Sequence, residues 1–170
     1  VRKNIKSARN KVEIIEEDNV DNLHAMLVKT FEHQGRSCPH KKEFINSIFE
    51  ACNEHDGAKV ITAIDKDGNV HASSLFVYDE KTCYYLIAGA DPTFRASGAQ
   101  TLVLDSGIEF ASKHSKAFDF EGSMIEGIEN FFRRFGADRV LYYQIEKKGF
   151  IGELKSLLKP RIKKLLGYKN

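Results

Sequence analysis

One stretch limits the fold more than any other: residues 116–137, KAFDFEGSMIEGIENFFRRFGA, combine a strand, a tight turn and a helix with nothing between them. Side chains alternate over 117–121, which predicts a strand with Phe118 and Phe120 on one face. Apolar residues at three- and four-residue spacing follow, and they predict a helix that ends at Gly136. Because a single strand is not stable alone, the preceding residues must supply the sheet that it joins.

The other face of this predicted strand carries two carboxylates, Asp119 and Glu121. Next-but-one residues on a strand lie about 7 Å apart. In a partly dry cleft, repulsion between two such groups favours protonation of one of them, which is one way to make a general base. An ion pair with a nearby Lys or Arg is the alternative, and the sequence leaves both open.

Ser123 and Glu126 have the spacing of a capping box, in which the Ser hydroxyl accepts the amide N–H three residues on and the Glu side chain reaches back. Capping is favoured over a nucleophilic role, because no G-x-S-x-G elbow surrounds Ser123. The helix N-terminus behind Gly122 is also a natural place for an anion.

The residues before 116 predict the sheet and its covering helices. We expect an apolar strand at 12–15, helices at 20–33 and 41–54, strands at 60–64, 70–77 and 82–90, and a further helix after residue 99. The tetrapeptide Lys66-Asp67-Gly68-Asn69 is a hairpin signal between the first two of the three consecutive strands. The predicted order is therefore strand, two helices, a three-stranded meander, helix, strand and helix.

The segment GADPTFRASGAQ, residues 89–100, joins the third meander strand to the next helix. A strand that enters a Gly-containing loop and then a helix aims several backbone amides and the positive helix end at one point. That geometry suits a pyrophosphate. A plain connection capped by Ser97 or Thr101 would have the same features, so both interpretations stay open.

The strings FDFEGS, FFRRFGA and GADPTFRASGA together resemble the GCN5-related N-acetyltransferase (GNAT) family, and within it the Fem-type branch of bacterial envelope aminoacyl transferases and related acetyltransferases. The resemblance implies an α/β (α+β) fold: a mixed sheet with an antiparallel meander, flanking helices and a splayed pair of parallel strands, 82–90 and 117–121. The reaction centre and the pantetheine arm of acetyl-CoA would lie at that splay. No metal is implied, and His33, Cys38 and His40 match no standard ligand spacing.

The pyrophosphate loop of the family follows the pattern Q/R-x-x-G-x-G/A. Here Arg95 and Gly98 fit the pattern, whereas Gln100 stands where the last Gly or Ala belongs. By resemblance, acetyl-CoA as the acyl donor would contact five consecutive residues, Arg95, Ala96, Ser97, Gly98 and Ala99.

The same resemblance implies a base that deprotonates the acceptor amine, and Glu121 and Asp119 are the candidates. Many members of the family have a general-acid Tyr where this chain has Phe132, which cannot protonate a leaving thiolate. Either Tyr142 or Tyr143, on a strand predicted at 140–146, serves instead, or proximity provides most of the rate.

The size and composition fit one domain, since 42% of the 170 residues are hydrophobic. We expect a GNAT-like acyltransferase domain at 11–146, between a basic leader or interdomain segment at 1–10 with little to bury and a basic amphipathic tail at 147–170. The leader is similar to the segment that joins two domains in Fem-type chains, which suggests a missing N-terminal domain. The 3 Cys residues form no C-x-x-C pair, which fits a reducing, cytoplasmic setting.

The basic ends favour an anionic partner such as tRNA, and the tail could contact a membrane surface peripherally. A solvated surface is the alternative for the basic ends, and packing of the leucines of the tail on the domain, with its lysines in water, is the alternative to membrane contact. The expected function is acetyl transfer from acetyl-CoA to an amine of a small molecule, an amino sugar or a cell-envelope precursor. The alternatives are Fem-type aminoacyl transfer from aminoacyl-tRNA to a peptidoglycan precursor, and a non-catalytic GNAT-like binding module, which Gln100 and Phe132 would favour.

Overall fold

The computed structural model describes residues 1–141 and 143. Val1–Ala137 form one compact unit, which contains every helix and strand that the structure describes. In chain order these are α1 (Arg2–Ala8), β1 (Glu13–Glu17), α2 (Asp21–His33), α3 (Lys42–Asn53), β2 (Ala58–Ile64), β3 (Val70–Tyr78), β4 (Thr82–Ala90), the short 3-10 helix η1 (Pro92–Ser97), α4 (Ala99–His114), β5 (Ala117–Asp119) and α5 (Glu126–Arg133).

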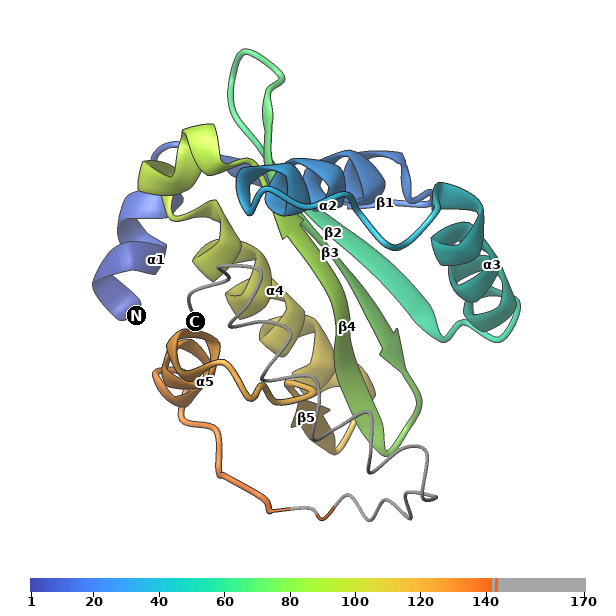
Figure 1. Cartoon of the computed structure of the whole chain (residues 1–170). Helices are drawn as coiled ribbons and strands as arrows, with labels where there is room; N and C mark the ends of the chain where they lie inside the picture. The colour runs from blue at the N-terminus through green and yellow to red at the C-terminus, as the bar shows by residue number, and fades with distance from the viewer. Residues whose placement is uncertain (142, 144–170) are drawn as a thin grey trace, which may run out of the picture. The chain divides into compact units, whose positions relative to one another are not determined.

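The five strands form a single sheet in the order β1-β2-β3-β4-β5 (Figure 1). Neighbours from β1 to β4 are antiparallel, and β5 is parallel to β4. The hairpin predicted between β2 and β3 is present, with Gly68 at φ +80° in its turn. The predicted mixed α/β fold, with its antiparallel meander and its parallel strand pair, is confirmed.

Helices cover both faces of the sheet (Figure 1). On one face, α2 and α3 bury Leu23, Leu27 and Phe49 against β2 and β3. On the other face, α1, α4 and α5 pack on a second core cluster that includes Phe76 of β3 and Tyr85 of β4. Alternating side chains of the central strands fill both clusters, which is why every residue of β2 and β3 is buried or half-buried.

The first residues are part of this core, so the interpretation that they have little to bury is wrong. Ala8 of α1 is fully buried, and Ile5 packs beside it against the cluster that contains α4. Arg9 forms an ion pair with Asp105 of α4 at 3.4 Å, and Lys11 Nζ donates to the carbonyl O of Ala96 at 2.8 Å. The segment therefore belongs to the same compact unit as the sheet.

The strand predicted at 117–121 is shorter than expected. It ends at Asp119, and the chain then turns through Glu121 and Gly122, both of which have positive φ values, 59° and 64°. The predicted capping box is also wrong. Ser123 Oγ accepts the N–H of Ile125 at 3.1 Å, two residues on, and Ile125 itself is the residue that precedes α5.

The strand predicted at 140–146 is not formed by the residues of it that the structure describes. Val140, Leu141 and Tyr143 lie in no helix or strand, and all three are exposed. Tyr142, the proposed proton donor, and the basic tail at 147–170 lie outside the described residues.

Candidate active site

All three residues of β5 pair with the start of the parallel strand β4, and β4 then continues beyond the end of β5. Their three paired positions are Thr82 with Ala117, Cys83 with Phe118, and Tyr84 with Asp119. Beyond Tyr84, β4 continues to Ala90, whereas β5 has already ended. In the part of the chain that the structure describes, no strand pairs with this stretch of β4 on the side of β5, and the predicted splay is therefore present.

A β-bulge lies immediately beyond the last paired position. Ile87 pairs with Leu75 of β3 and Tyr85 pairs with Phe76, so that Leu86 is the extra residue. Bulges of this kind bend a strand and redirect its side chains. Here the bulge coincides with the point at which β4 and β5 separate.

Tyr84 and Asp119 are brought together at this point. Register partners on parallel strands lie about 4.8 Å apart and point to the same face of the sheet. Cys83 and Phe118, one position earlier, belong to the core cluster on the α4 side, so Tyr84 and Asp119 point to the opposite face, that of α2 and α3. Both side chains are exposed. A hydroxyl and a carboxylate thus lie side by side where the splay begins.

Glu121, the other predicted base, is not a strand neighbour of Asp119. Its backbone N–H donates to Oδ1 of Asp119 at 2.7 Å within the turn that follows β5. Its side chain is exposed. The structure therefore brings Asp119 to the splay as predicted, but the expected pair of carboxylates on one strand face is not formed.

The open edge of β4 ends where α2 closes it. Oγ1 of Thr30 accepts the N–H of Ala90 at 2.9 Å and lies 3.0 Å from the carbonyl O of the same residue. The backbone N–H and C=O of Ala90 point away from β3. Because these directions alternate along a strand, the N–H and C=O of Ala88 point the same way. Gly89 packs between them directly against the α2 backbone, since a Cβ atom there would lie 2.3 Å from the N atom of Leu27.

The predicted phosphate-binding loop forms η1 and the first turn of α4. Arg95 and Ala96 are exposed, whereas Ser97 and Ala99 are buried. Oγ of Ser97 accepts the N–H of Ala99 at 3.2 Å, whereas the residue that precedes α4 is Gly98, which has no side-chain cap. Gly98 has a φ value of +76°, and a side chain on it would contact Ala8 of α1 at 3.5 Å. Of the five predicted donor residues, Arg95 and Ala96 offer exposed side chains.

Gln100 does not obstruct this loop, although it occupies the position where the family has Gly or Ala. Its side chain points to the sheet, where its Nε2 donates to the hydroxyl of Tyr85 and lies 3.5 Å from Oγ of Ser74. Burial raises the pKa of Tyr85 to about 12, against the opposing effect of its hydrogen bonds to Ser74 and Gln100. Tyr85 is therefore a neutral, structural group.

Phe132 is buried, and its ring meets that of Tyr85 at 5.9 Å in an edge-to-face arrangement. It anchors α5 to the sheet and supplies no proton. The hydroxyl closest in register to the splay is that of Tyr84, a residue that sequence reasoning did not single out. The alternation of the strand 82–90 could have indicated it, because Cys83 and Tyr85 point inward and Tyr84 therefore points outward.

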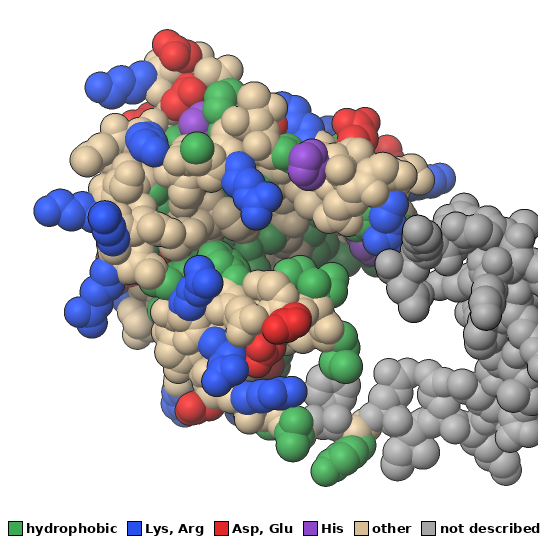
Figure 2. All heavy atoms as spheres, turned by 60° about the vertical axis from the view of Figure 1, so that its left-hand side comes forward, with side chains coloured by type: hydrophobic (Ala, Val, Ile, Leu, Met, Phe, Trp, Pro, Cys, Tyr) green, Lys and Arg blue, Asp and Glu red, His purple; other side chains and the backbone are tan. Residues whose placement is uncertain are grey.

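Several hydrophobic side chains of β4 and of the α5 segment are exposed. Tyr84 and Leu86 on β4 are 36% and 38% exposed, and Ile128 of α5 is 40% exposed, with Met124 and Ile125 more exposed just before it. The space-filling view shows hydrophobic side chains in a hollow of the surface on the side that carries α1 and α5 (Figure 2).

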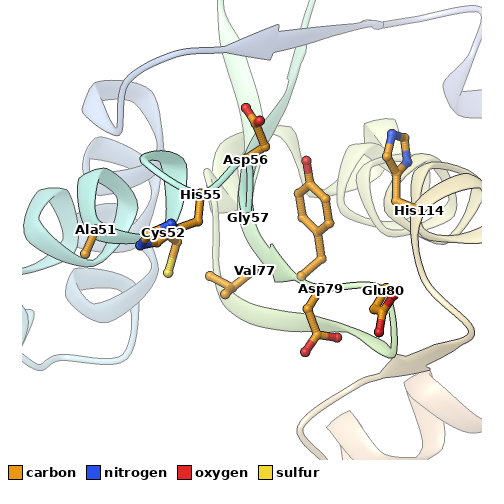
Figure 3. A pocket seen from close by; sticks show the side chains of 10 residues that line it. Ala51, Cys52, His55, Asp56, Gly57, Val77, Asp79, Glu80 and His114 are labelled. Atoms are coloured by element: carbon orange, nitrogen blue, oxygen red, sulfur yellow. The ribbon is translucent and has the colours of Figure 1, made fainter.

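A cavity of about 510 Å³ lies at the end of the sheet where β4 begins. Cys52, His55 and Asp56 line it from the end of α3, and His114 lines it from the end of α4 (Figure 3). Asp79 and Glu80 line it from the turn before β4, and Val77, the register partner of Tyr84, lines it from β3. The cavity therefore lies beside the start of β4, and the phosphate-binding loop follows the other end of the strand.

Within residues 1–141 and 143, no cluster of three or more His, Cys, Asp or Glu side chains is placed to hold a metal ion. No helix in the same part of the chain combines the length and the apolar character needed to cross a membrane.

Solved structures with this fold include several acetyltransferases. The glucosamine-6-phosphate N-acetyltransferase of Arabidopsis thaliana is 12% identical, with a TM-score of 0.57 over 81% of this chain and 97% of its own. An aminoglycoside N-acetyltransferase in complex with CoA is also 12% identical, with a TM-score of 0.58 over 80% of this chain and 95% of its own. FemX is 12% identical, with a TM-score of 0.65 over 76% of this chain, which spans 51% of FemX. At these identities the likeness concerns the fold alone.

No curated protein matches the sequence. The family model described as "Acetyltransferase (GNAT) domain" matches residues 1–143, which is most of the chain. The splayed strands and the loop that opens α4 agree with that match. The chain therefore belongs to the GNAT acetyltransferase family and is an acyltransferase that acts on amino groups.

Proposed function

We propose that the chain transfers the acetyl group of acetyl-CoA to a primary amine of a small molecule. The observation that carries this proposal is the open edge of β4, which runs from the Tyr84–Asp119 pair to the loop at η1. A pantetheine arm contains two amides, and amides of an extended ligand can pair with an open strand edge. The donor would thus lie along β4 with its thioester near Tyr84 and its phosphates near Arg95.

The chemistry assigns different roles to the two register partners. The carboxylate of Asp119 accepts a proton from the acceptor amine, whose nitrogen attacks the thioester carbonyl carbon. As the new C–N bond forms, the C–S bond breaks and the thiolate of CoA leaves. The Tyr84 hydroxyl gives that thiolate its proton, and the proton held by Asp119 restores the tyrosine. Tyr142, which the resemblance suggested as the acid, is a competing proposal.

The acceptor would approach from the cavity at the start of β4. Its wall at Val77 lies one strand from Tyr84 and two strands from Asp119, which is about 10 Å. Asp56, Asp79 and Glu80 line this cavity, and their negative charge attracts a protonated amine. Such an amine releases its extra proton to water before its nitrogen attacks, and the neutral amine is the species that gives a proton to Asp119. We therefore propose a small cationic amine as the acceptor.

Titration calorimetry with acetyl-CoA tests the donor site. Ala96→Glu adds bulk and negative charge at an exposed loop position, and Ser47→Glu adds the same charge at an exposed position on α3. We expect Ala96→Glu to weaken binding by at least about tenfold and Ser47→Glu to leave it unchanged. Gly98 is unsuitable for this purpose, because its positive φ and its contact with α1 would make Gly98→Glu a stability variant.

Absence of acetyl-CoA binding in the wild-type chain would contradict the proposal. Aminoacyl transfer from aminoacyl-tRNA, the Fem-type alternative, would then be tested by the salt dependence of tRNA binding. The lysines and arginines of residues 1–11 are the described groups that would contribute to such a partner. Membrane contact by the tail at 147–170 would be tested with anionic vesicles.

A further inference from the structure

His71, near the start of β3, is a buried histidine that the proposed reaction does not use. It is 6% exposed, and in the described part of the chain its Nδ1 atom has no hydrogen-bond partner. Its Nε2 atom lies 3.0 Å from Oδ2 of Asp65. Because an ionised carboxylate only accepts hydrogen bonds, we assign the ring proton to Nε2. The bond to Asp65 is then the hydrogen bond that orients the ring.

Asp65 is itself fixed by the turn of the β2–β3 hairpin. Its Oδ1 accepts the N–H groups of Asp67 and Asn69, each at 2.9 Å, and its Oδ2 accepts the side-chain amide of Asn69 at 3.0 Å. The Asn69 side chain contributes most to holding the pKa of Asp65 at about 2, and burial opposes it. The acceptor of the His71 bond is therefore an ionised group with a fixed position.

The other neighbour of the His71 ring is Phe94 of η1. The two rings stack with centroids 4.0 Å apart and planes within 5°. Phe94 lies at the kink of η1, where the backbone leaves helical values at φ −99° and ψ 16°. The N–H of Asp91 also donates to the carbonyl O of His71 at 2.9 Å. Figure 1 shows the yellow-green segment that contains η1 beside the base of the hairpin.

This stack holds the middle of the segment that carries the proposed donor contacts. The start of η1 is held by Lys29, whose Nζ lies 2.6 Å from Oδ2 of Asp91, and its end by Lys11, which donates to Ala96. Between these two attachments, Phe94 is the residue whose ring rests on the sheet. Arg95 and Ala96 follow it directly, so a shift of Phe94 displaces both.

We propose that Asp65, His71 and Phe94 form a brace that sets the position of η1 and thereby the affinity of the chain for its acyl donor. His71 is a positioning residue in this arrangement, because it acts through Phe94 and not on the donor. The brace is a property of the free protein. Its effect on the donor rests on the proposed function, since that function places the phosphates at η1.

Two readouts on the full chain separate these statements: hydrogen exchange of the amides at 93–101 in the free protein, and the Kd for acetyl-CoA. The variants are His71→Ala, which removes the ring, and His71→Phe, which keeps a ring against Phe94. His40→Ala is the matched control, because His40 also stacks on a phenylalanine ring, that of Phe44 in α3, at 6.2 Å. Phe94→Leu removes the stack from its other side and replaces His71→Ala if that variant does not fold.

We expect His71→Ala to speed exchange at 93–101 and to weaken acetyl-CoA binding about three- to tenfold, the range that one aromatic stack supports. The kcat at saturating donor should stay within about twofold of wild type, because the reacting groups are untouched. His71→Phe keeps a ring against Phe94 but loses the bond to Asp65, so it should restore both the exchange rates and the affinity in part. His40→Ala should change neither the exchange rates nor the affinity.

Unchanged exchange at 93–101 in both His71→Ala and Phe94→Leu would overturn the brace. Faster exchange with unchanged donor affinity would overturn its link to binding. Faster exchange spread evenly over the whole chain would show a role in global stability alone, and it too would overturn the proposal. A wild-type chain that binds no acetyl-CoA would refute the proposed function, and the exchange data would still decide whether η1 is braced.

Discussion

Tyr84 of β4 and Asp119 of β5 are register partners at the last position where the two strands pair, and both side chains point away from α4. Immediately beyond them β5 ends and the bulge at Leu86 begins in β4. The pair therefore marks the point where a ligand that lies along β4 would meet ionisable side chains of this sheet.

Asp119→Asn should lower kcat by about two to four orders of magnitude, the usual contribution of a general base. Glu121→Gln is the matched control and should stay within about threefold of wild type, because Glu121 lies in the turn beyond the strand. The asparagine keeps an oxygen that can accept the Glu121 N–H, so the turn should persist. Steady-state kinetics with acetyl-CoA and an accepted amine provide the measurement. A large loss of kcat in Glu121→Gln, together with a small change in Asp119→Asn, would assign the base to Glu121.

Gly89→Ala should destabilise the fold by about 3 kcal/mol or more, because the added methyl would lie 2.3 Å from a backbone atom of Leu27. Neither a strand nor a helix backbone can move aside cheaply. Gly127→Ala, in α5, has nothing within 4 Å of the added atom and should be stabilising by up to about 1 kcal/mol. Urea unfolding of the two variants measures both effects, and equal midpoints would contradict the close packing of α2 on β4.

Cys83 should be inert to thiol reagents in the folded protein. It is fully buried, and burial raises the pKa of its thiol to about 12, so that about one molecule in ten thousand carries the reactive thiolate at pH 8. Cys38 and Cys52 are half-buried and should react first. With a thiol reagent that releases a chromophore, the absorbance followed over time should show a fast phase in which two thiols react. The third thiol should react only when the protein unfolds. Three equal rates would refute the burial of β4.

Acid should remove a contribution of Asp65 to stability. The pKa of Asp65 is about 2 in the folded chain, below its ordinary value of 3.8, because of its hydrogen bonds in the hairpin. A depressed pKa means that the ionised form stabilises the fold above about pH 4 and that this effect is lost as the pH falls toward 2. The Tm difference between wild type and Asp65→Asn should therefore shrink over that range. A constant difference would show that the charge of Asp65 contributes nothing.

Most helices and strands could be predicted from the sequence, because their signals are local. The hairpin at Asp67-Gly68 and the helix stop at Gly35 follow from backbone conformations that glycine adopts readily, and both are where they were expected. The segment 1–10 was misjudged, since its composition is basic and the burial of Ala8 depends on the distant α4. A contact of one alanine with a distant helix produces no periodic pattern of apolar residues in a helix as short as α1, which has seven residues.

The candidate site was harder to predict, because it depends on register. The sequence indicated Asp119, but the pairing with Tyr84 is fixed by how α4 returns the chain to the sheet. The direction of the Gln100 side chain was equally hidden. Gln100 stands at the last Gly or Ala position of the family pattern, which suggested a phosphate-binding loop that had lost its function. In the structure its side chain points inward to Tyr85 and Ser74. Such outcomes are decided by tertiary packing and not by local propensity.

The closure of the β4 edge by Thr30 gives the proposed donor site a fixed length. From Tyr84 to Ala90 the strand spans six residue steps, or about 20 Å, and Thr30 occupies the last amide. The open edge would then select acyl donors by length, because a donor fits when the distance from its thioester to its phosphates equals that span. Thioesters on shorter or longer arms would carry the same reactive carbon and still be poor substrates.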